Sequence, residues 1–130
     1  MKKKRILIVE DEGSILKLET ILLTVKGYEV SGALNGKEAL EKLSLGVFDL
    51  VLLDIMLPDI DGFEVCRSIR NNPQTSMIPI IMLTAKKTPE DHHRGLSCGA
   101  DGYITKPFKS ASIIEEIEGL LQRNGISARS

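Results

Sequence analysis

Carboxylates stand at the ends of two apolar runs in this sequence. Glu10 and Asp11 directly follow the run at residues 6–9, and Asp54 directly follows the run at residues 50–53. A charge at the end of a buried strand is costly unless it is paired, and three crowded carboxylates repel one another unless a divalent cation lies between them. A ligand set made of oxygens alone suits Mg²⁺, with Mn²⁺ as a substitute. The spacing therefore predicts a cation site if these run ends meet.

Two further polar residues, Thr84 and Lys106, stand at the ends of later apolar runs. Lys106 carries a point charge that suits a phosphate oxygen, and the Thr84 hydroxyl can donate a hydrogen bond to another. Together with the carboxylate of Asp54 as nucleophile and a hard cation, these groups can form and hold an aspartyl phosphate. This chemistry requires that all the run ends lie at one edge of a single sheet.

Apolar runs of strand length alternate along the chain with patterns typical of helices. Strands are expected at residues 6–9, 28–33, 48–54, 78–84 and 102–105, and helices at 14–27, 35–46, 63–71, 88–98 and 110–123. Such connections produce a parallel sheet with helices on both faces, and a closed barrel would need more units. The expected fold is α/β, a flavodoxin-like, doubly wound, five-stranded parallel sheet with strand order 2-1-3-4-5 and five helices. In that order the carboxyl ends of strands one, three, four and five are contiguous.

The first two expected helices carry clear local signals. The first places Ile15, Leu18, Leu22 and Val25 on one face, and this spacing of three and four residues is typical of an amphipathic helix. The second opens with Asn35, a residue type that is strongly preferred as an N-cap.

The composition limits the classes of function. The chain has 130 residues, of which 17 are basic and 18 acidic, so it lacks the basic excess that is usual for a nucleic-acid-binding domain. Its apolar stretches are too short to span a bilayer or to form a signal peptide, which predicts a cytoplasmic protein that contacts neither membrane nor nucleic acid directly. The two cysteines, Cys66 and Cys98, lack metal-binding spacing and are expected to be buried thiols.

The sequence resembles the receiver domain of bacterial two-component response regulators. Four motifs carry the resemblance in order: "ILIVEDE", "DLVLLDIMLPDIDGFEV", "PIIMLTA" and "GADGYITKPF". The resemblance runs from Arg5 to Arg123. We therefore expect one receiver domain over residues 1–123 and a flexible C-terminal tail over residues 124–130.

The resemblance assigns roles to the acidic residues. It implies that Asp54 is the phosphoacceptor and also a metal ligand. Asp11 would bind Mg²⁺ directly, Glu10 would act through water, and the backbone carbonyl of Met56 would be the remaining protein ligand. Met56 also occupies a position that tunes phosphate hydrolysis in the family. Because its side chain cannot orient an attacking water, we expect a longer-lived phosphorylated state than an amide there would give.

The resemblance also assigns a phosphoryl-binding pair and a switch. Thr84 and Lys106 would hold the phosphoryl group, Tyr103 would be the switch aromatic, and the peptide bond from Lys106 to Pro107 is expected to be cis. On phosphorylation Thr84 would move inward and Tyr103 would follow. The face made by the fourth helix, the fifth strand and the fifth helix would then change.

The implied function is that of a signalling phosphoacceptor rather than an enzyme, with self-catalysed phosphoryl transfer and slow autodephosphorylation. The donor would be a sensor histidine kinase or a phosphotransfer protein. The recipient of the signal would be an effector or output domain that the sequence does not identify. A phosphorylation-dependent homodimer is compatible with this function.

Three other classes of protein fit the same residues less well. A flavodoxin would need a phosphate-cradling loop after the first strand, where "EDEGS" would repel a phosphate. A related aspartyl-phosphate phosphatase would need a second aspartate at position 56, and the glycine of "DIDGFEV" falls at the wrong place for an EF-hand. The remaining alternative is a pseudo-receiver, a protein-interaction module that never uses the phosphate.

Overall fold

The five strands form one parallel sheet in the order β2-β1-β3-β4-β5, as the sequence predicts. The computed structural model describes residues 3–84, 98–105 and 110–129. The strands are β1 (Arg5–Val9), β2 (Glu29–Ala33), β3 (Leu50–Asp54), β4 (Ile80–Thr84) and β5 (Gly102–Thr105). The helices within the described residues are α1 (Gly13–Val25), α2 (Gly36–Leu45), α3 (Gly62–Asn71) and α5 (Ser110–Arg129). The helix expected at residues 88–98 falls almost entirely outside them.

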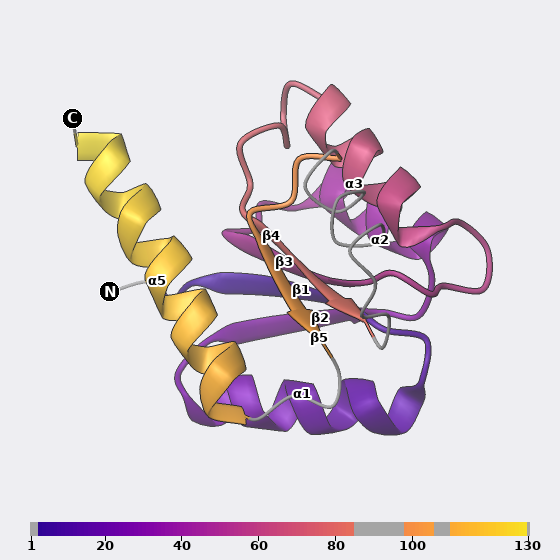
Figure 1. Ribbon diagram of the computed structural model, residues 1–130, viewed down its shortest axis with the longest axis horizontal. Coiled ribbons are helices and arrows are strands. Elements are labelled where there is room, and N and C mark those ends of the chain that lie inside the picture. Colours follow the sequence, from indigo (N-terminus) through magenta and orange to yellow (C-terminus); the bar gives the residue numbers. More distant parts are fainter. Residues whose placement is uncertain (1–2, 85–97, 106–109, 130) are drawn as a thin grey trace.

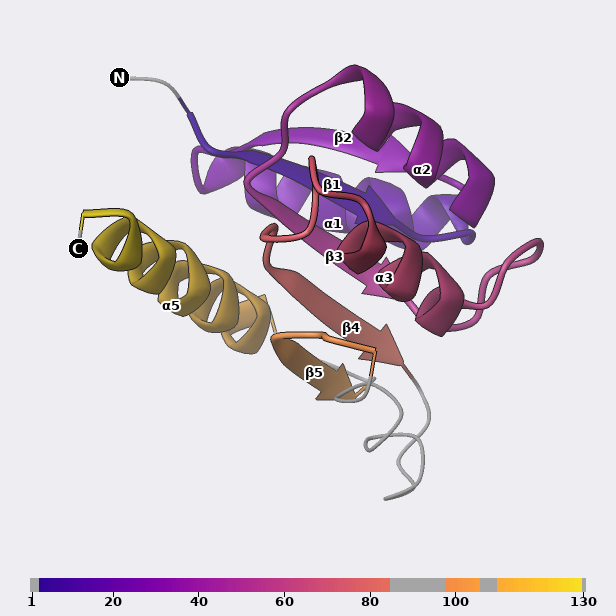
Figure 2. The same cartoon turned by 90° about the horizontal axis from the view of Figure 1, so that it is seen from above.

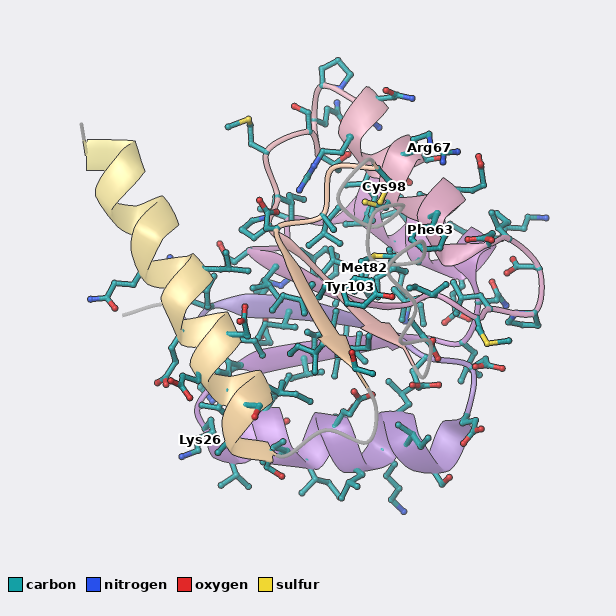
Figure 3. The ribbon with its side chains drawn as sticks, viewed as in Figure 1. Lys26, Phe63, Arg67, Met82, Cys98 and Tyr103 are labelled. Carbon is teal, nitrogen blue, oxygen red and sulfur yellow. The ribbon has the colours of Figure 1, made fainter. Side chains whose placement is uncertain are left out.

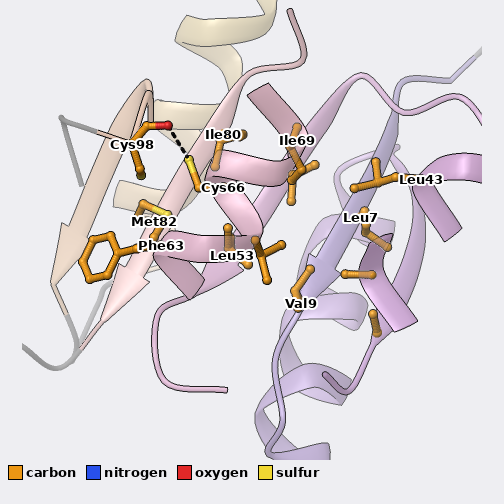
Figure 4. Packing of buried hydrophobic residues seen from close by; sticks show 14 of the residues in the cluster. Leu7, Val9, Leu43, Leu53, Phe63, Cys66, Ile69, Ile80, Met82 and Cys98 are labelled. Atoms are coloured by element: carbon orange, nitrogen blue, oxygen red, sulfur yellow. Dashed lines mark hydrogen bonds between the residues drawn. The ribbon is translucent and has the colours of Figure 1, made fainter. Parts of the chain in front are cut away.

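Helices cover both faces of the sheet. Figures 1 and 2 show α2 and α3 on one face, with α1 and α5 on the other. Since successive side chains of a strand point to opposite faces, the apolar run of β1 serves two cores. Leu7 and Val9 belong to the core under α2 and α3, which Figure 4 shows in part, whereas Ile6 and Ile8 belong to the core under α1 and α5. This division explains why the central strands carry apolar residues at successive positions and not at every second one.

The register of the sheet fixes which residues follow the strands side by side. Val9 of β1 lies opposite Leu53 of β3. The next residues along the two strands are Glu10 and Asp54, so their carboxylates come to the same level of the sheet edge. Thr84 ends β4 one position beyond the partner of Asp54, which is Leu83.

Only part of the apolar face predicted for α1 packs on the sheet: Leu22 packs against the core under α1 and α5. Leu18 and Val25 are 66% and 78% exposed, whereas Glu19 and Leu23 are buried. The expected amphipathic pattern is therefore present, but α1 is rotated so that much of it faces solvent. Periodicity defines a face of a helix without saying which face a neighbouring sheet covers.

The last helix, α5, continues to Arg129, beyond the boundary drawn from the sequence at Arg123. Its apolar residues Ile113 and Ile117 pack in the core under α1 and α5. The division into a domain and a tail stays a prediction.

Among the described helices, none combines the length and the apolar composition needed to cross a membrane.

Helix α3 is joined to the turn that leads into β5. Both cysteines are buried, as expected, and the thiol of Cys66 donates a hydrogen bond to the backbone oxygen of Cys98 at 3.3 Å (Figure 4). Arg70 donates to the backbone oxygen of Gly99 at 2.9 Å and to the carboxylate of Asp101 at 2.7 Å. These bonds hold the start of β5 against α3.

The chain between β3 and α3 closes tightly on itself. The N–H of Gly62 donates to the backbone oxygen of Ile55 at 2.8 Å. A Cβ at Gly62 would lie 2.5 Å from the backbone oxygen of Asp54 and 2.6 Å from the Cα of Ile55. These are backbone atoms that a rotamer change cannot move, so only glycine fits this closure.

We expect Gly62→Ala to lower the free energy of unfolding by about 2 kcal/mol or more, because the added methyl group forces the backbone apart. Urea denaturation measures this change. Gly13→Ala is the control, because a Cβ there meets no described atom within 4 Å, and it should unfold at the wild-type midpoint or slightly above. Equal midpoints for the two variants would contradict the packing argument.

Candidate functional site

Three carboxylates meet where β1 and β3 end. Glu10, Asp11 and Asp54 each offer one oxygen, and these oxygens all lie within 4.8 Å of one another. Glu10 and Asp54 are only 1% and 5% exposed, whereas Asp11 is exposed. The cluster therefore has a buried side, held by the sheet, and one side open to solvent.

Short hydrogen-bonded links orient the two buried carboxylates. Asp54 Oδ1 accepts a bond from the N–H of Met56 at 3.1 Å, and Glu10 Oε2 accepts one from the N–H of Glu12 at 3.3 Å. Glu12 is the N-cap residue of α1, although its side chain makes no capping bond. The N-terminus of α1 thus lies next to the cluster, where its dipole favours negative charge.

A hollow of about 360 Å³ opens beside Asp11. The chain that follows β3 forms its other wall. Its lining residues are Asp11, Ile55, Met56, Leu57, Pro58 and Asp61. The hollow borders the carboxylate cluster at Asp11 and is large enough for a cation that keeps part of its water shell.

The donor set fits a hard divalent cation. The three carboxylates supply only oxygen atoms, at a separation that one ion can bridge. Mg²⁺ prefers such ligands and usually retains several waters, which the open side at Asp11 admits. Glu10, Asp11 and Asp54 are the groups that would hold it, and the backbone carbonyl of Met56 stays a ligand expected from the resemblance.

The other residues singled out in the sequence lie around this edge or outside the described part. Met56 lies on the wall of the hollow with 60% of its surface exposed. Thr84 is the last residue of β4, opposite Thr105 of β5. Lys106 and its bond to Pro107 fall outside the described residues, so the phosphoryl-binding pair and the cis peptide stay predictions.

Tyr103 lies on β5 directly opposite Met82 of β4, and the two are drawn next to one another in Figure 3. It is partly buried and packs against the core under α2 and α3. This position is common for an aromatic at the edge of a core. The switch role of Tyr103 therefore remains an expectation from the resemblance.

Two aspartates near the site have partners that the sequence analysis did not identify. Asp61 caps α3 by accepting a hydrogen bond from the N–H of Phe63 at 2.7 Å. An aspartate followed three residues later by Glu64 is a capping signal that could have revealed this. Asp59 accepts bonds from the N-terminus of α2, which is more than 20 residues away in the chain, and no local pattern indicates such a contact.

The fold and the site together define a class of protein: an open, doubly wound α/β sheet with a carboxylate cluster at the carboxyl edge of its strands. Residues 6–118 match the response regulator receiver domain, and the chain belongs to that family.

Several curated relatives are named as transcriptional regulators. The chain is 45% identical over 127 residues to the alkaline phosphatase synthesis transcriptional regulatory protein PhoP of Bacillus subtilis, covering 98% of this chain and 52% of that protein. It is 40% identical over 119 residues to the phosphate regulon transcriptional regulatory protein PhoB of Rhizobium meliloti, covering 92% and 52%. The chain thus spans about half the length of the curated relatives it matches.

Solved structures with the same fold include single receiver domains. The chemotaxis protein CheY4 of Vibrio cholerae superimposes with a TM-score of 0.88 at 33% identity, covering 92% of this chain and 99% of that one. A CheY-like receiver domain protein of Methanospirillum hungatei gives a TM-score of 0.92 at 34% identity, covering 97% and 99%. Both similarities extend over more than nine-tenths of this chain.

Charge crowding predicts how the site responds to Mg²⁺. We expect Asp11→Asn to raise the midpoint of thermal unfolding in EDTA by roughly 2–5 °C, because it removes one of three neighbouring negative charges. Added MgCl₂ should raise the midpoint of the wild type, since a ligand that binds the native state stabilises it. MgCl₂ should raise the unfolding midpoint of Asp11→Asn much less, because the variant lacks one carboxylate ligand. A variant that melts at or below the wild-type midpoint in EDTA would contradict the charge argument.

Proposed function

We propose that this receiver domain is a phosphoacceptor that takes a phosphoryl group from a sensor histidine kinase, or from a phosphotransfer protein, onto Asp54 in the presence of Mg²⁺. The observation that carries the proposal is the nearly buried carboxylate of Asp54 within 4.8 Å of two further carboxylates that can share a cation with it. Its role is signalling, and any catalysis is confined to forming and losing its own acyl phosphate.

The transfer follows from the geometry of the site. A carboxylate oxygen of Asp54 forms the new bond to phosphorus while the phosphorus–nitrogen bond of the donor phosphohistidine breaks, and the imidazole nitrogen keeps the electron pair. The N–H of Met56 donates to Asp54 Oδ1 and so orients the carboxylate. A bound Mg²⁺ would neutralise charge on the transferring phosphoryl oxygens. By resemblance, Thr84 and Lys106 would hold the remaining ones.

A protein donor is supported by the exposed apolar face of α1. Leu18, Ile21 and Val25 form a stripe of side chains that are all more than half exposed. A contiguous apolar patch on a soluble domain commonly marks a protein contact. The helix that carries it begins beside Asp11, so a partner docked on this stripe would reach the open side of the site.

The downstream role is inferred from the relatives. Several are named as transcriptional regulators and are about twice as long as this chain, so we infer that the phosphorylated receiver domain controls a transcriptional output. The near-neutral charge of this chain argues against direct nucleic-acid binding by the receiver domain itself. The proposed switch at Tyr103 would transmit the change.

Phosphorylation is tested by intact-protein mass spectrometry after incubation with acetyl phosphate. We expect the mass of one added phosphoryl group in the presence of MgCl₂ and no addition in EDTA. Asp54→Asn should remain unmodified under both conditions, because it lacks the nucleophile. Wild-type protein that stays unmodified with acetyl phosphate and with a phosphorylated histidine kinase would favour the pseudo-receiver.

The side chain at position 56 is predicted to set the lifetime of the phosphorylated state. We expect Met56→Asn to lose its phosphoryl group about tenfold faster than the wild type, because an amide can orient the attacking water and a thioether cannot. Met77→Asn is a matched control, since Met77 is also highly exposed and precedes β4 at the opposite end of the sheet. Decay of Met56→Asn at the wild-type rate would refute this role.

A further inference from the structure

Asp59 connects the chain after β3 to the N-terminus of α2. We call residues 55–61 the β3–α3 loop. The carboxylate of Asp59 accepts hydrogen bonds from the N–H of Gly36 at 2.9 Å and the N–H of Lys37 at 3.0 Å. It also accepts one from the N–H of Ile60, within its own loop, at 2.8 Å. One side chain thus joins two segments that are 22 residues apart.

The N-terminus of α2 has two caps of different kinds. Asn35 accepts a bond from the N–H of Glu38 at 2.8 Å and acts within the helix itself. Asp59 accepts from the N–H groups of Gly36 and Lys37, which precede Glu38 and would otherwise lack partners in the helix. The bond from Lys37 is the main cause that lowers the pKa of the Asp59 carboxyl, so the carboxylate stays charged at neutral pH and interacts favourably with the helix dipole.

The loop and α2 are in close contact beside this link. A Cβ at Gly36 would lie 3.1 Å from Ile60 of the loop and 2.8 Å from Val65 of α3, so there is no room for a side chain at this point of α2. Ile60 itself packs against the core under α2 and α3. The position of Asp59 is therefore set by packing as well as by its hydrogen bonds.

The same loop forms one wall of the hollow at the carboxylate cluster. Its first part is fixed by the bond from Met56 to Asp54 and its end by the bond from Gly62 to Ile55. Between these two points, the bonds of Asp59 join the loop to α2, while Asp61 joins its end to α3 by accepting from the N–H of Phe63. Met56, three residues before Asp59, borders the hollow together with Asp11.

We infer that Asp59 is a positioning residue for the metal site: by tying the β3–α3 loop to α2 it holds the backbone of Met56 at the edge of the hollow, across from Asp11. Asp59 is not itself a ligand. The inference rests on the proposed Mg²⁺ site. It predicts that metal affinity depends on a side chain that does not contact the metal, as is common for groups that orient ligands.

The test compares two variants that each remove one cap from α2. Asp59→Ala breaks the link to the loop, whereas Asn35→Ala removes the cap that belongs to the helix alone. Each protein is titrated with MgCl₂ and followed by the amide shifts of residues at the cluster in NMR spectra. Urea denaturation of the same samples reports the loss of stability.

Both variants should be less stable than the wild type, because each loses a cap. Only Asp59→Ala should bind Mg²⁺ more weakly, by about tenfold, the lower end of the loss usual for groups that orient ligands. Asp59→Asn keeps the shape of the side chain and one acceptor oxygen, so its affinity should fall between those of Asp59→Ala and the wild type. Asp59→Asn also replaces Asp59→Ala in the comparison if Asp59→Ala does not fold.

The inference would be overturned if Asp59→Ala and Asn35→Ala bound Mg²⁺ with equal affinity, and Asp59 would then be a helix cap alone. If Asp59→Ala does not fold, the same comparison is made between Asp59→Asn and Asn35→Ala. Equal affinity would leave the proposed function intact, because the wild type would still bind Mg²⁺ at the cluster. Wild-type protein whose amide shifts at Asp54 and Asp11 do not respond to MgCl₂ would instead overturn the Mg²⁺ site and, with it, this role of Asp59.

Discussion

Electrostatic repulsion among three carboxylates is the constraint on which this site depends. The parallel pairing of β1 with β3 holds Glu10 and Asp54 at the same level, and a shift by one residue would turn one of them to the opposite face. The strands can impose this arrangement because their apolar residues are buried on both faces, and each such side chain contributes about 1.5–3 kcal/mol. The core of the sheet thus offsets a repulsion that a flexible loop could not sustain.

The parts of the site differ in how firmly they are held. Asp54 belongs to the central strand of the sheet, while the backbone of Met56 lies on a loop whose closure requires glycine at position 62. Side-chain bonds from Asp59 and Asp61 join that loop to α2 and α3. The rigid sheet positions Asp54, the proposed nucleophile, and the two helices hold the loop that forms one wall of the hollow.

The sequence predicted those features that depend on the direction and order of the strands. Continuous apolar runs that end in Glu10, Asp11 and Asp54 indicated a parallel sheet and a cation site at its edge, and the structure brings these three carboxylates together. The sequence does not predict the rotation of α1, because the spacing of apolar residues such as Leu18 defines a face without saying whether the sheet covers it. Nor does it predict the bonds of Asp59 to α2, since a contact across 22 residues leaves no local pattern.

We propose that Asp54 and a divalent cation together form a site for a phosphoryl group. This site is tested by ¹⁹F NMR of the protein with beryllofluoride, which mimics an acyl phosphate on a carboxylate. We expect bound fluorine resonances with wild-type protein and MgCl₂, and none in EDTA or with Asp54→Asn. Bound resonances that persist without a divalent cation, or in Asp54→Asn, would contradict this proposal, as would their absence from the wild type in MgCl₂.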